Sequence, residues 1–213
     1  MKKQSLIIWY VVWVVFYVAL VILNYCLYGS DLVKMLSCVG IGLNILFVHL
    51  RSPKDYLLQI ALVFTLLSDM IIATGASAFL CVFAVAFAQF FHFSRLAELK
   101  TRAFLWFLMI LMLTVYLSSL LGADLVFMMG TFSACFLCGN LILSVSWYRK
   151  ARTLSSMCAM LGFALFALCD ICVALSYHLQ LGTMSPSMQE AMDYMSWIFY
   201  YPSQIFIALS GKV

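Results

Sequence analysis

Residues 6–27 read LIIWYVVWVVFYVALVILNYCL, a run that contains no charged side chain. A helix rises about 1.5 Å per residue, so a run of this length can cross a hydrocarbon core of about 30 Å. It is too long for the apolar part of a secretory signal, and no obvious Ala-x-Ala cleavage site separates it from the next apolar run. The sequence therefore predicts an uncleaved transmembrane helix here.

The rest of the chain has the same character. Of its 213 residues, 66% are hydrophobic and 9% are charged, and the mean hydropathy is +1.09. A soluble domain carries about 25% charged residues, and no soluble globule could bury this much apolar surface. Nothing resembles a linker or a low-complexity tract. We expect one membrane domain over residues 1–213, without disulfides, because the eight cysteines all fall inside or at the ends of apolar runs.

Further apolar runs of similar length follow the first, separated by short segments that carry glycine, proline or charges. They predict an all-α fold, a bundle of eight transmembrane helices in continuous hairpins. The expected spans are approximately Leu6 to Leu27, Leu32 to Leu50, Tyr56 to Ala73, Ala76 to Phe93, Phe104 to Leu120, Leu125 to Trp147, Leu154 to Tyr177, and Met192 to Leu209.

The basic residues orient this bundle. Loops rich in Lys and Arg stay on the cytoplasmic side of a membrane, and with eight spans only Lys34 falls on the opposite side. Both termini are therefore expected in the cytoplasm of a multi-pass protein of the cell membrane. The charge of +4 then reflects topology rather than a nucleic-acid partner. The residues that share the cytoplasmic side are Lys2, Lys3, Arg51, Lys54, Arg95, Lys100, Arg102, Arg149, Lys150, Arg152 and Lys212.

Two acidic residues interrupt this pattern. Asp69 and Asp170 lie inside apolar runs, where an aspartate at mid-span costs about 2.5–3.5 kcal/mol. Both spans run outward, and each aspartate comes some four-fifths of the way along, so we expect the two carboxyls at similar depth in one pocket. Two carboxyls in a low-dielectric site do not both ionise cheaply, so one is expected to keep its proton. The pair suits a proton relay or acid-base hydrolysis; the alternative is that each merely bonds a neighbouring helix.

Other polar residues of the spans are most simply interpreted as hydrogen-bond partners between helices, each contributing about 0.6–2 kcal/mol. They are Asn24, Asn44, His49, Gln59, Gln89, His92, Asn140, Tyr200, Tyr201, Ser203 and Gln204.

The spacing of Cys135 to Cys138 and of Cys169 to Cys172 would suit a four-thiolate zinc site. Four thiolates around one zinc ion would bury net negative charge in lipid, however, and cysteine also packs as a small apolar residue. We therefore expect no metal. The tryptophans, Trp197 among them, are interpreted as packing and interfacial anchors.

Three stretches resemble the YhhN family of lysoplasmalogenase-like membrane proteins: LLSDMII at 66–72, ALCDICVAL at 167–175 and YYPSQIFIALS at 200–210. The family pattern has an aspartate in span three, His or Gln in the next span, a second aspartate, and a closing Tyr-Tyr-x-x-Gln. Departures from it are Ser68 for the usual Gly, Cys169 for the usual Ser, and Gln89 where animal relatives have His. Residues at the family positions are Asp69, Gln89, Asp170, Tyr200, Tyr201 and Gln204.

The resemblance implies a hydrolase that cleaves the vinyl ether bond of lysoplasmalogens to a fatty aldehyde and a glycerophospho-alcohol. Asp69 and Asp170 would be catalytic, and Gln89, Tyr200, Tyr201 and Gln204 would bind the lysophospholipid, without a cofactor. The alternative is a proton-coupled transporter or lipid-binding membrane protein without hydrolysis, and a scaffold protein comes third. The two aspartate stretches are alike at an offset of 101 residues, which would suit two four-helix halves, about 1–102 and 103–213.

Overall fold

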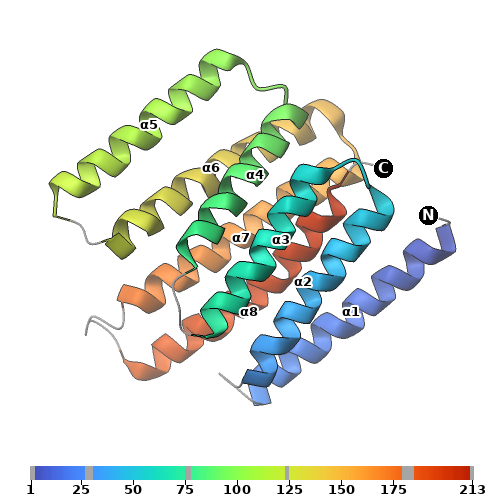
Figure 1. The fold of residues 1–213 in the computed structure, drawn as a ribbon. Helices are drawn as coiled ribbons and strands as arrows, with labels where there is room; N and C mark the ends of the chain where they lie inside the picture. The colour runs from blue at the N-terminus through green and yellow to red at the C-terminus, as the bar shows by residue number, and fades with distance from the viewer. Residues whose placement is uncertain (1–2, 27–30, 75–77, 123–124, 179–184, 212–213) are drawn as a thin grey trace.

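A computed structural model describes residues 3–26, 31–74, 78–122, 125–178 and 185–211, which form eight α-helices and no strand (Figure 1). The all-α prediction is confirmed for these residues. The charges Lys2, Asp124 and Lys212 lie outside them, as do parts of the expected loops, including Gly29, Ser30, Gly75 and Gly182. The helices are α1 (Lys3–Cys26), α2 (Asp31–Arg51), α3 (Tyr56–Ala73), α4 (Phe79–Leu96), α5 (Thr101–Leu120), α6 (Leu125–Ala151), α7 (Leu154–His178) and α8 (Pro186–Leu209).

The helix α8 begins six residues before the expected span. Its first turn is polar, so hydropathy does not detect it, but Pro186 supplies the start. Proline suits the first helical position because its fixed φ matches the helix and its missing N–H would have no partner there. Pro202 lies inside the same helix and cannot bond to the carbonyl of Ile198. The hydroxyl of Tyr17 on α1 donates to that carbonyl at 3.1 Å instead.

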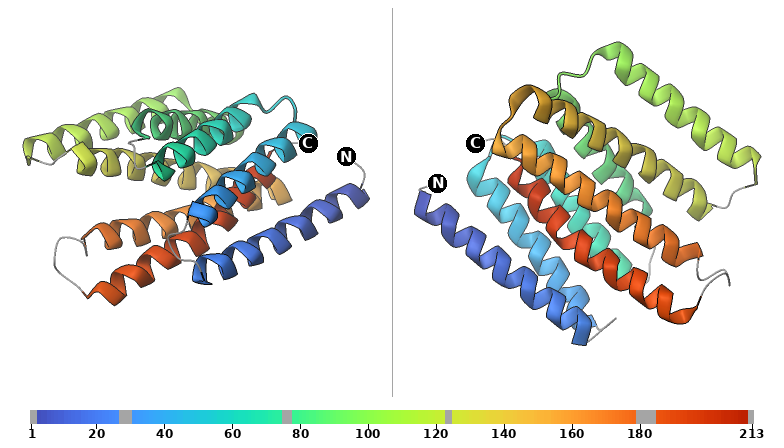
Figure 2. Two further views of the ribbon diagram at one scale, coloured as in Figure 1. Left: turned by 60° about the horizontal axis from the view of Figure 1, so that its bottom comes forward. Right: turned by 180° about the vertical axis from the view of Figure 1, so that it is seen from behind.

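Six of the helices form a closed ring. Contacts run from α2 to α3, α4, α6, α7 and α8, and from α8 back to α2. The ring is flattened into two layers, with α2, α3 and α4 on one side and α8, α7 and α6 on the other (Figures 1 and 2). Residues that line the interior of this ring are therefore close in space although they come from the whole length of the chain.

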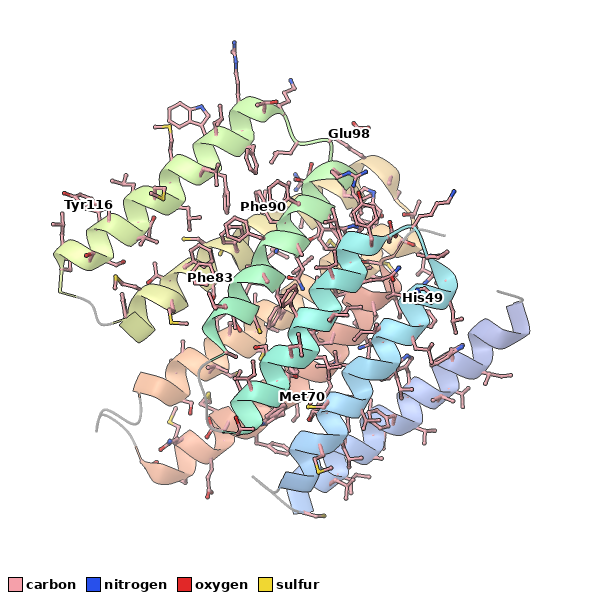
Figure 3. All side chains as sticks on the ribbon, in the orientation of Figure 1. His49, Met70, Phe83, Phe90, Glu98 and Tyr116 are labelled. Atoms are coloured by element: carbon pink, nitrogen blue, oxygen red, sulfur yellow. The ribbon has the colours of Figure 1, made fainter. Side chains whose placement is uncertain are left out.

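The remaining two helices flank the ring. The helix α1 packs against α2 and α8, and α5 packs against α6 on the opposite flank. Aromatic contacts join α5 to the ring. Phe107 of α5 stacks on Phe90 of α4, with ring centroids 4.3 Å apart, and meets Phe136 of α6 edge-on, with centroids 5.3 Å apart. Figure 3 shows Phe83 and Phe90 along this side of α4. The flanking helices leave broad apolar faces outward, including Val11, Val14, Val15, Val18, Trp106, Met109, Ile110, Met112 and Leu113.

Such outward faces suit lipid rather than water. Within the described residues, three helical segments are long and apolar enough to cross a membrane, namely 101–120, 127–151 and 154–176. Four shorter apolar segments, 11–23, 35–51, 56–72 and 80–96, accompany them. The helices therefore have the character of a membrane protein, whereas a count of eight spans remains a prediction.

Basic side chains gather at one end of the bundle, where the even-numbered helices finish. Arg51 Nη1 donates to the carbonyl of Leu209 at 3.0 Å, and Lys150 Nζ donates to the carbonyl of Ala97 at 2.7 Å. Both cations thus bond carbonyls at helix C-termini, where the helix dipole favours positive charge. We call this the basic end. The same contacts join the ends of α2 and α8, and of α4 and α6.

Candidate functional site

A cavity of about 520 Å³ lies inside the ring. All six ring helices contribute to its wall, and most of the wall is apolar, with Phe136, Leu137 and Phe166 among the larger side chains. Its volume falls within the range of about 300–1,000 Å³ that is usual for small-molecule sites. An apolar enclosure with few polar groups is suited to an amphiphile whose polar parts meet those groups.

Asp69 and Asp170 both line this cavity, from α3 and α7. The shared pocket expected from their matched depth is therefore present. The hydroxyl of Tyr200 lies 3.0 Å from Asp69 Oδ1 and 2.8 Å from Oδ2 and donates to that carboxyl. Within the described part of the chain, Asp170 has no hydrogen-bond partner. Tyr200 thus orients one carboxyl of the pair, and the other lines the cavity without a donor from any described residue.

The cavity reaches the surface one helical turn beyond the two carboxyls. Ile72 follows Asp69 by three residues and Val173 follows Asp170 by three, so each lies on the same helix face as its aspartate. Both line the cavity, and both are more than half exposed, at 57% and 51%. They are on the side of the aspartates that faces away from the basic end. This mouth is apolar, as expected of an opening toward lipid.

Deeper in the cavity lie two primary amides, Gln89 on α4 and Asn140 on α6. Each side chain is only 2% exposed. Gln89 Nε2 and Asn140 Oδ1 have no hydrogen-bond partner among the described residues. A buried polar atom without a partner costs roughly 1–3 kcal/mol. These atoms therefore suit a polar group that occupies the cavity.

The other two expected binding residues do not line the cavity. Tyr201 is buried, and its hydroxyl hydrogen-bonds Ser37, which does line it. Gln204 is also buried, with no partner for its Oε1 among the described residues. On α8 the lining ends at Tyr200. A direct contact of Tyr201 or Gln204 with a ligand is therefore absent from this arrangement.

Two residues of α8 line the cavity but were not expected there. Trp197 was interpreted as an interfacial anchor, yet it packs edge-on against Tyr200 at 5.8 Å and lines the cavity together with Ser196. Their spacing of three and four residues from Tyr200 places all three on one helix face. This helical spacing is the sequence feature that could have placed Ser196 and Trp197 in the cavity wall. It is informative only once Tyr200 is known to face a cavity.

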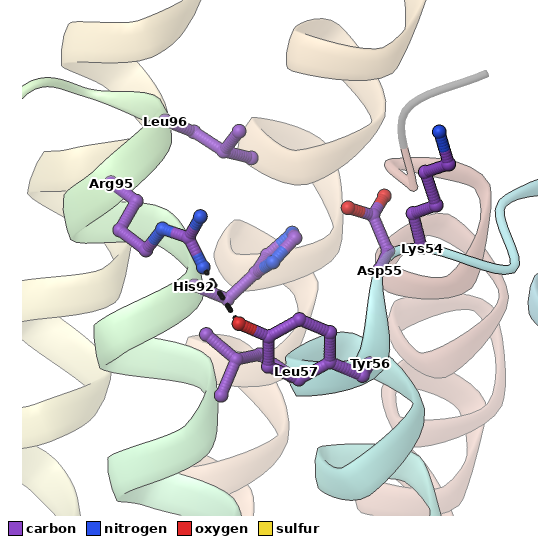
Figure 4. A pocket seen from close by; sticks show the side chains of 7 residues that line it. All are labelled: Lys54, Asp55, Tyr56, Leu57, His92, Arg95 and Leu96. Carbon is purple, nitrogen blue, oxygen red and sulfur yellow. Dashed lines mark hydrogen bonds between the residues drawn. The ribbon is translucent and has the colours of Figure 1, made fainter.

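A smaller pocket of about 250 Å³ lies at the basic end, between the start of α3 and the end of α4 (Figure 4). Arg95 Nη1 donates to the Tyr56 hydroxyl across it at 3.4 Å, and Lys54, Asp55 and His92 complete its polar wall. His92 comes one turn after Gln89, so the same helix α4 carries residues of both cavities. Neither Asp69 nor Asp170 lines this pocket.

Other polar residues named from the sequence make structural contacts at the basic end. His49 Nδ1 lies 3.2 Å from Gln59 Oε1, and Gln59 Nε2 donates to the carbonyl of Ser52. The cysteine pairs hold no disulfide among the described residues, and no three metal-ligating side chains converge there. Of these cysteines, Cys169 is buried and lines the cavity beside Asp170.

Comparison with known proteins identifies one family. The model of the YhhN family matches residues 29–211, which includes all six ring helices and the cavity that they enclose. No curated protein and no solved structure matches the chain.

Proposed function

This chain belongs to the YhhN family, and we propose that it is a membrane hydrolase that cleaves the vinyl ether bond of lysoplasmalogens. The products are a fatty aldehyde and a glycerophospho-alcohol. The observation that carries the proposal is the presence of two carboxyls, Asp69 and Asp170, in the wall of one apolar cavity. Such a cavity accommodates a lipid chain, and paired carboxyls supply both an acid and a base.

The reaction begins with transfer of a proton from one carboxyl to the outer vinyl carbon. This leaves an oxocarbenium ion, which the ionised second carboxyl stabilises electrostatically. The ionised carboxyl then takes a proton from water as the water oxygen attacks the cation, which forms a hemiacetal. Collapse of the hemiacetal breaks its bond to the glycerol oxygen, which leaves as a hydroxyl. During this collapse the first carboxyl, now ionised, takes the proton of the hemiacetal hydroxyl, and the second carboxyl donates its proton to the departing glycerol oxygen. One water is consumed in total, and both carboxyls recover their protonation states.

Hydrogen-bonding residues of the cavity support this chemistry. Tyr200 orients the carboxyl of Asp69, and Gln89 offers an amide to the polar part of the lipid. Tyr201 and Gln204 act one layer away, in the packing behind the cavity wall. No step requires a metal ion or an organic cofactor.

The surrounding topology forms part of the proposal. All eight helices span the cell membrane, with the basic end and both termini in the cytoplasm, because basic loops remain on that side. The lipid enters laterally through the apolar mouth at Ile72 and Val173.

The decisive experiment measures aldehyde release from lysoplasmalogen by protein purified in detergent. Asp69→Asn and Asp170→Asn keep the side-chain size and remove the acid-base function, which usually contributes about 10²–10⁴-fold. We expect each variant to lose at least about a hundredfold in kcat. The matched control is Asp193→Asn on α8, which keeps an acceptor for its partner Ser176 and does not line the cavity. It should retain normal turnover.

Wild-type turnover in either cavity variant would overturn the acid-base assignment. If the wild-type protein binds lysolipid without releasing aldehyde, the second candidate replaces the first. That candidate is a lipid-binding or proton-coupled transport protein. The apolar lining of the cavity favours it, because such a lining accommodates a lipid whether or not a bond is cleaved. Uptake of labelled lysolipid into vesicles with a pH gradient separates the transporter from a passive binder.

A further inference from the structure

We propose that Gln89 and Asn140 form a hydrogen-bonding subsite for the free glycerol hydroxyl that a lysolipid carries next to its scissile ether. The inference rests on the proposed function and deepens it, because it assigns the preference for lysolipids over diacyl lipids to two named side chains. We call these two residues the amide pair.

The register of the helices places the two amides at one level. The helices α4 and α6 run in the same direction, since Phe83 packs on Phe132 at 3.8 Å and Phe87 packs on Phe136 at 4.9 Å. Both contacts join residues 49 apart in the chain. The bond from Lys150 to Ala97 joins residues 53 apart. Gln89 and Asn140 are 51 apart, between these values, so they face the cavity at the same height.

The chemistry of the amide pair matches a hydroxyl group. A hydroxyl donates one hydrogen bond and accepts others, and each primary amide offers both a donor and an acceptor. The donor Gln89 Nε2 and the acceptor Asn140 Oδ1 are buried, and no described residue of the protein bonds to either. One hydroxyl between them satisfies both at once. An acyl ester at the same position has no hydrogen to donate and is far bulkier.

The amide pair also has the right depth relative to the carboxyls. Phe93 of α4 meets Phe163 of the antiparallel α7 edge-on at 4.9 Å. Gln89 lies four residues before Phe93. Because α7 runs in the opposite direction, the residue level with Gln89 is four residues after Phe163, which is Ala167. Asp170 is three residues further toward the mouth, a rise of about 4.5 Å. An ether oxygen near Asp170 therefore places the hydroxyl on the adjacent glycerol carbon near the amides.

The order of groups along the cavity matches the order of groups along a lysolipid. The hydrocarbon chain of the lipid leaves the cavity through the apolar mouth at Ile72 and Val173. The ether meets the carboxyls, and the hydroxyl meets the amide pair. One and two turns further along α4, His92 and Arg95 line the polar pocket at the basic end (Figure 4). The headgroup of the lipid points in this direction.

The first experiment compares lysoplasmalogen with its 2-deoxy analogue, which keeps the vinyl ether and lacks the hydroxyl. Wild-type protein should prefer the hydroxyl substrate by about tenfold or more in kcat/KM, because the analogue leaves both amides unpaired. In Asn140→Leu, which is similar in size and apolar, the preference should disappear through loss of activity on the hydroxyl substrate alone. Asn140→Asp, which keeps an acceptor oxygen, should retain part of the preference.

The matched control is Asn44→Leu on α2. Asn44 is equally buried and also has an Oδ1 without a partner among the described residues, but it does not line the cavity. This variant should keep the wild-type preference for the hydroxyl substrate. Equal losses on both substrates in Asn140→Leu, or a wild-type protein that does not distinguish the substrates, would overturn the subsite.

The second experiment measures binding without cleavage and so separates this inference from the proposed reaction. The ligand is a saturated 1-alkyl ether lysolipid, compared with its 2-deoxy form, and the readout is the dissociation constant of purified protein in detergent. The hydroxyl form should bind about tenfold more tightly to wild type and equally to Asn140→Leu. Equal wild-type affinities would refute the subsite. A hydroxyl preference in binding without any aldehyde release would refute the hydrolase and retain the subsite.

Discussion

At the residue scale, the contact between Tyr200 and Asp69 is the most specific feature of the cavity. The hydroxyl of Tyr200 donates to both oxygens of the Asp69 carboxyl. A hydrogen bond to a charged group contributes about 1.5–3 kcal/mol. Tyr200→Phe removes that bond and little else. We expect kcat for aldehyde release to fall by about ten- to a hundredfold, with a smaller change in KM, since the bond orients the reacting group rather than the lipid.

The neighbouring tyrosine provides the control for this measurement. Tyr201→Phe removes a hydroxyl that bonds Ser37 instead of a carboxyl. It should leave kcat within about threefold of wild type and act mainly on thermal stability, by the 0.5–1.5 kcal/mol of a neutral hydrogen bond. If the two variants lose kcat equally, the hydroxyl of Tyr200 has no special role at Asp69.

Sequence patterns located the two cavity carboxyls, and the family resemblance added Gln89 and Tyr200, but neither placed Asn140, Ser196 or Trp197 in a ligand site. Asp69 and Asp170 were identifiable because charge within an apolar run needs compensation. Tyr200 and Tyr201 look alike in sequence, although consecutive residues on a helix point about 100° apart and only one faces the cavity. Gln204 shares the face of Tyr200, but the cavity wall ends before it. Where a cavity ends depends on packing across helices, which the sequence of one helix does not contain.

At the scale of elements, the close approach of α7 and α8 fixes the wall that carries Asp170 and Tyr200. A Cβ added at Gly162 would lie 3.0 Å from the backbone nitrogen of Ile207 and 3.1 Å from the carbonyl oxygen of Ser203. Backbone atoms cannot move aside, so Gly162→Ala must separate the helices. We expect a loss of about 1–3 kcal/mol in the free energy of unfolding, seen as a lower melting temperature in detergent.

Gly130 on α6 provides the comparison, because a Cβ there would meet nothing within 4 Å. Alanine also has the higher helix propensity, by up to about 1 kcal/mol. Gly130→Ala should therefore match or exceed the wild-type melting temperature. Equal stability of the two alanine variants would show that α7 and α8 are less tightly packed than the distances at Gly162 indicate.

The helices themselves were largely predictable, since the breaks between apolar runs coincide with their ends. The extended start of α8 was not, because its polar first turns carry no hydropathy signal. Nor does the proline in YYPSQ indicate that a hydroxyl on α1 replaces the lost helical bond. That substitution depends on which helix lies alongside, a property of the assembled bundle.

At the scale of the whole molecule, the ring shows a relation between the two halves of the chain. The helices α1 and α5 each stay outside, and the three helices after each one enter the ring. The aspartate lies on the third helix of each four-helix half, α3 and α7, so the two carboxyls come from corresponding positions. The division near residue 102 remains a prediction, but this arrangement gives it a concrete form. Hydropathy alone predicts which segments are apolar and does not indicate which of them close a ring.

The proposed orientation of the molecule rests on the distribution of its charges and can be tested at four exposed positions. Pro53 and Lys100 lie at the basic end, and Thr74 and Ser185 lie at the opposite end. Each becomes cysteine in a Cys26→Ser background, because Cys26 is exposed at the end of α1 and would itself react. Cys138 is also exposed but lies in the middle of α6, where an apolar surround keeps a polar maleimide away. A membrane-impermeant maleimide should label Thr74→Cys and Ser185→Cys in intact cells.

The two positions at the basic end should react only after the membrane is permeabilised, because basic loops are retained in the cytoplasm. Labelling of Pro53→Cys in intact cells would reverse the orientation, and with it the side from which Ile72 and Val173 admit lipid. Different accessibility of Pro53 and Lys100 would mean that α3 and α4 do not both cross. The same four measurements therefore test whether α3 and α4 cross and which side each end of the bundle faces, and their outcome assigns the cavity mouth to a leaflet.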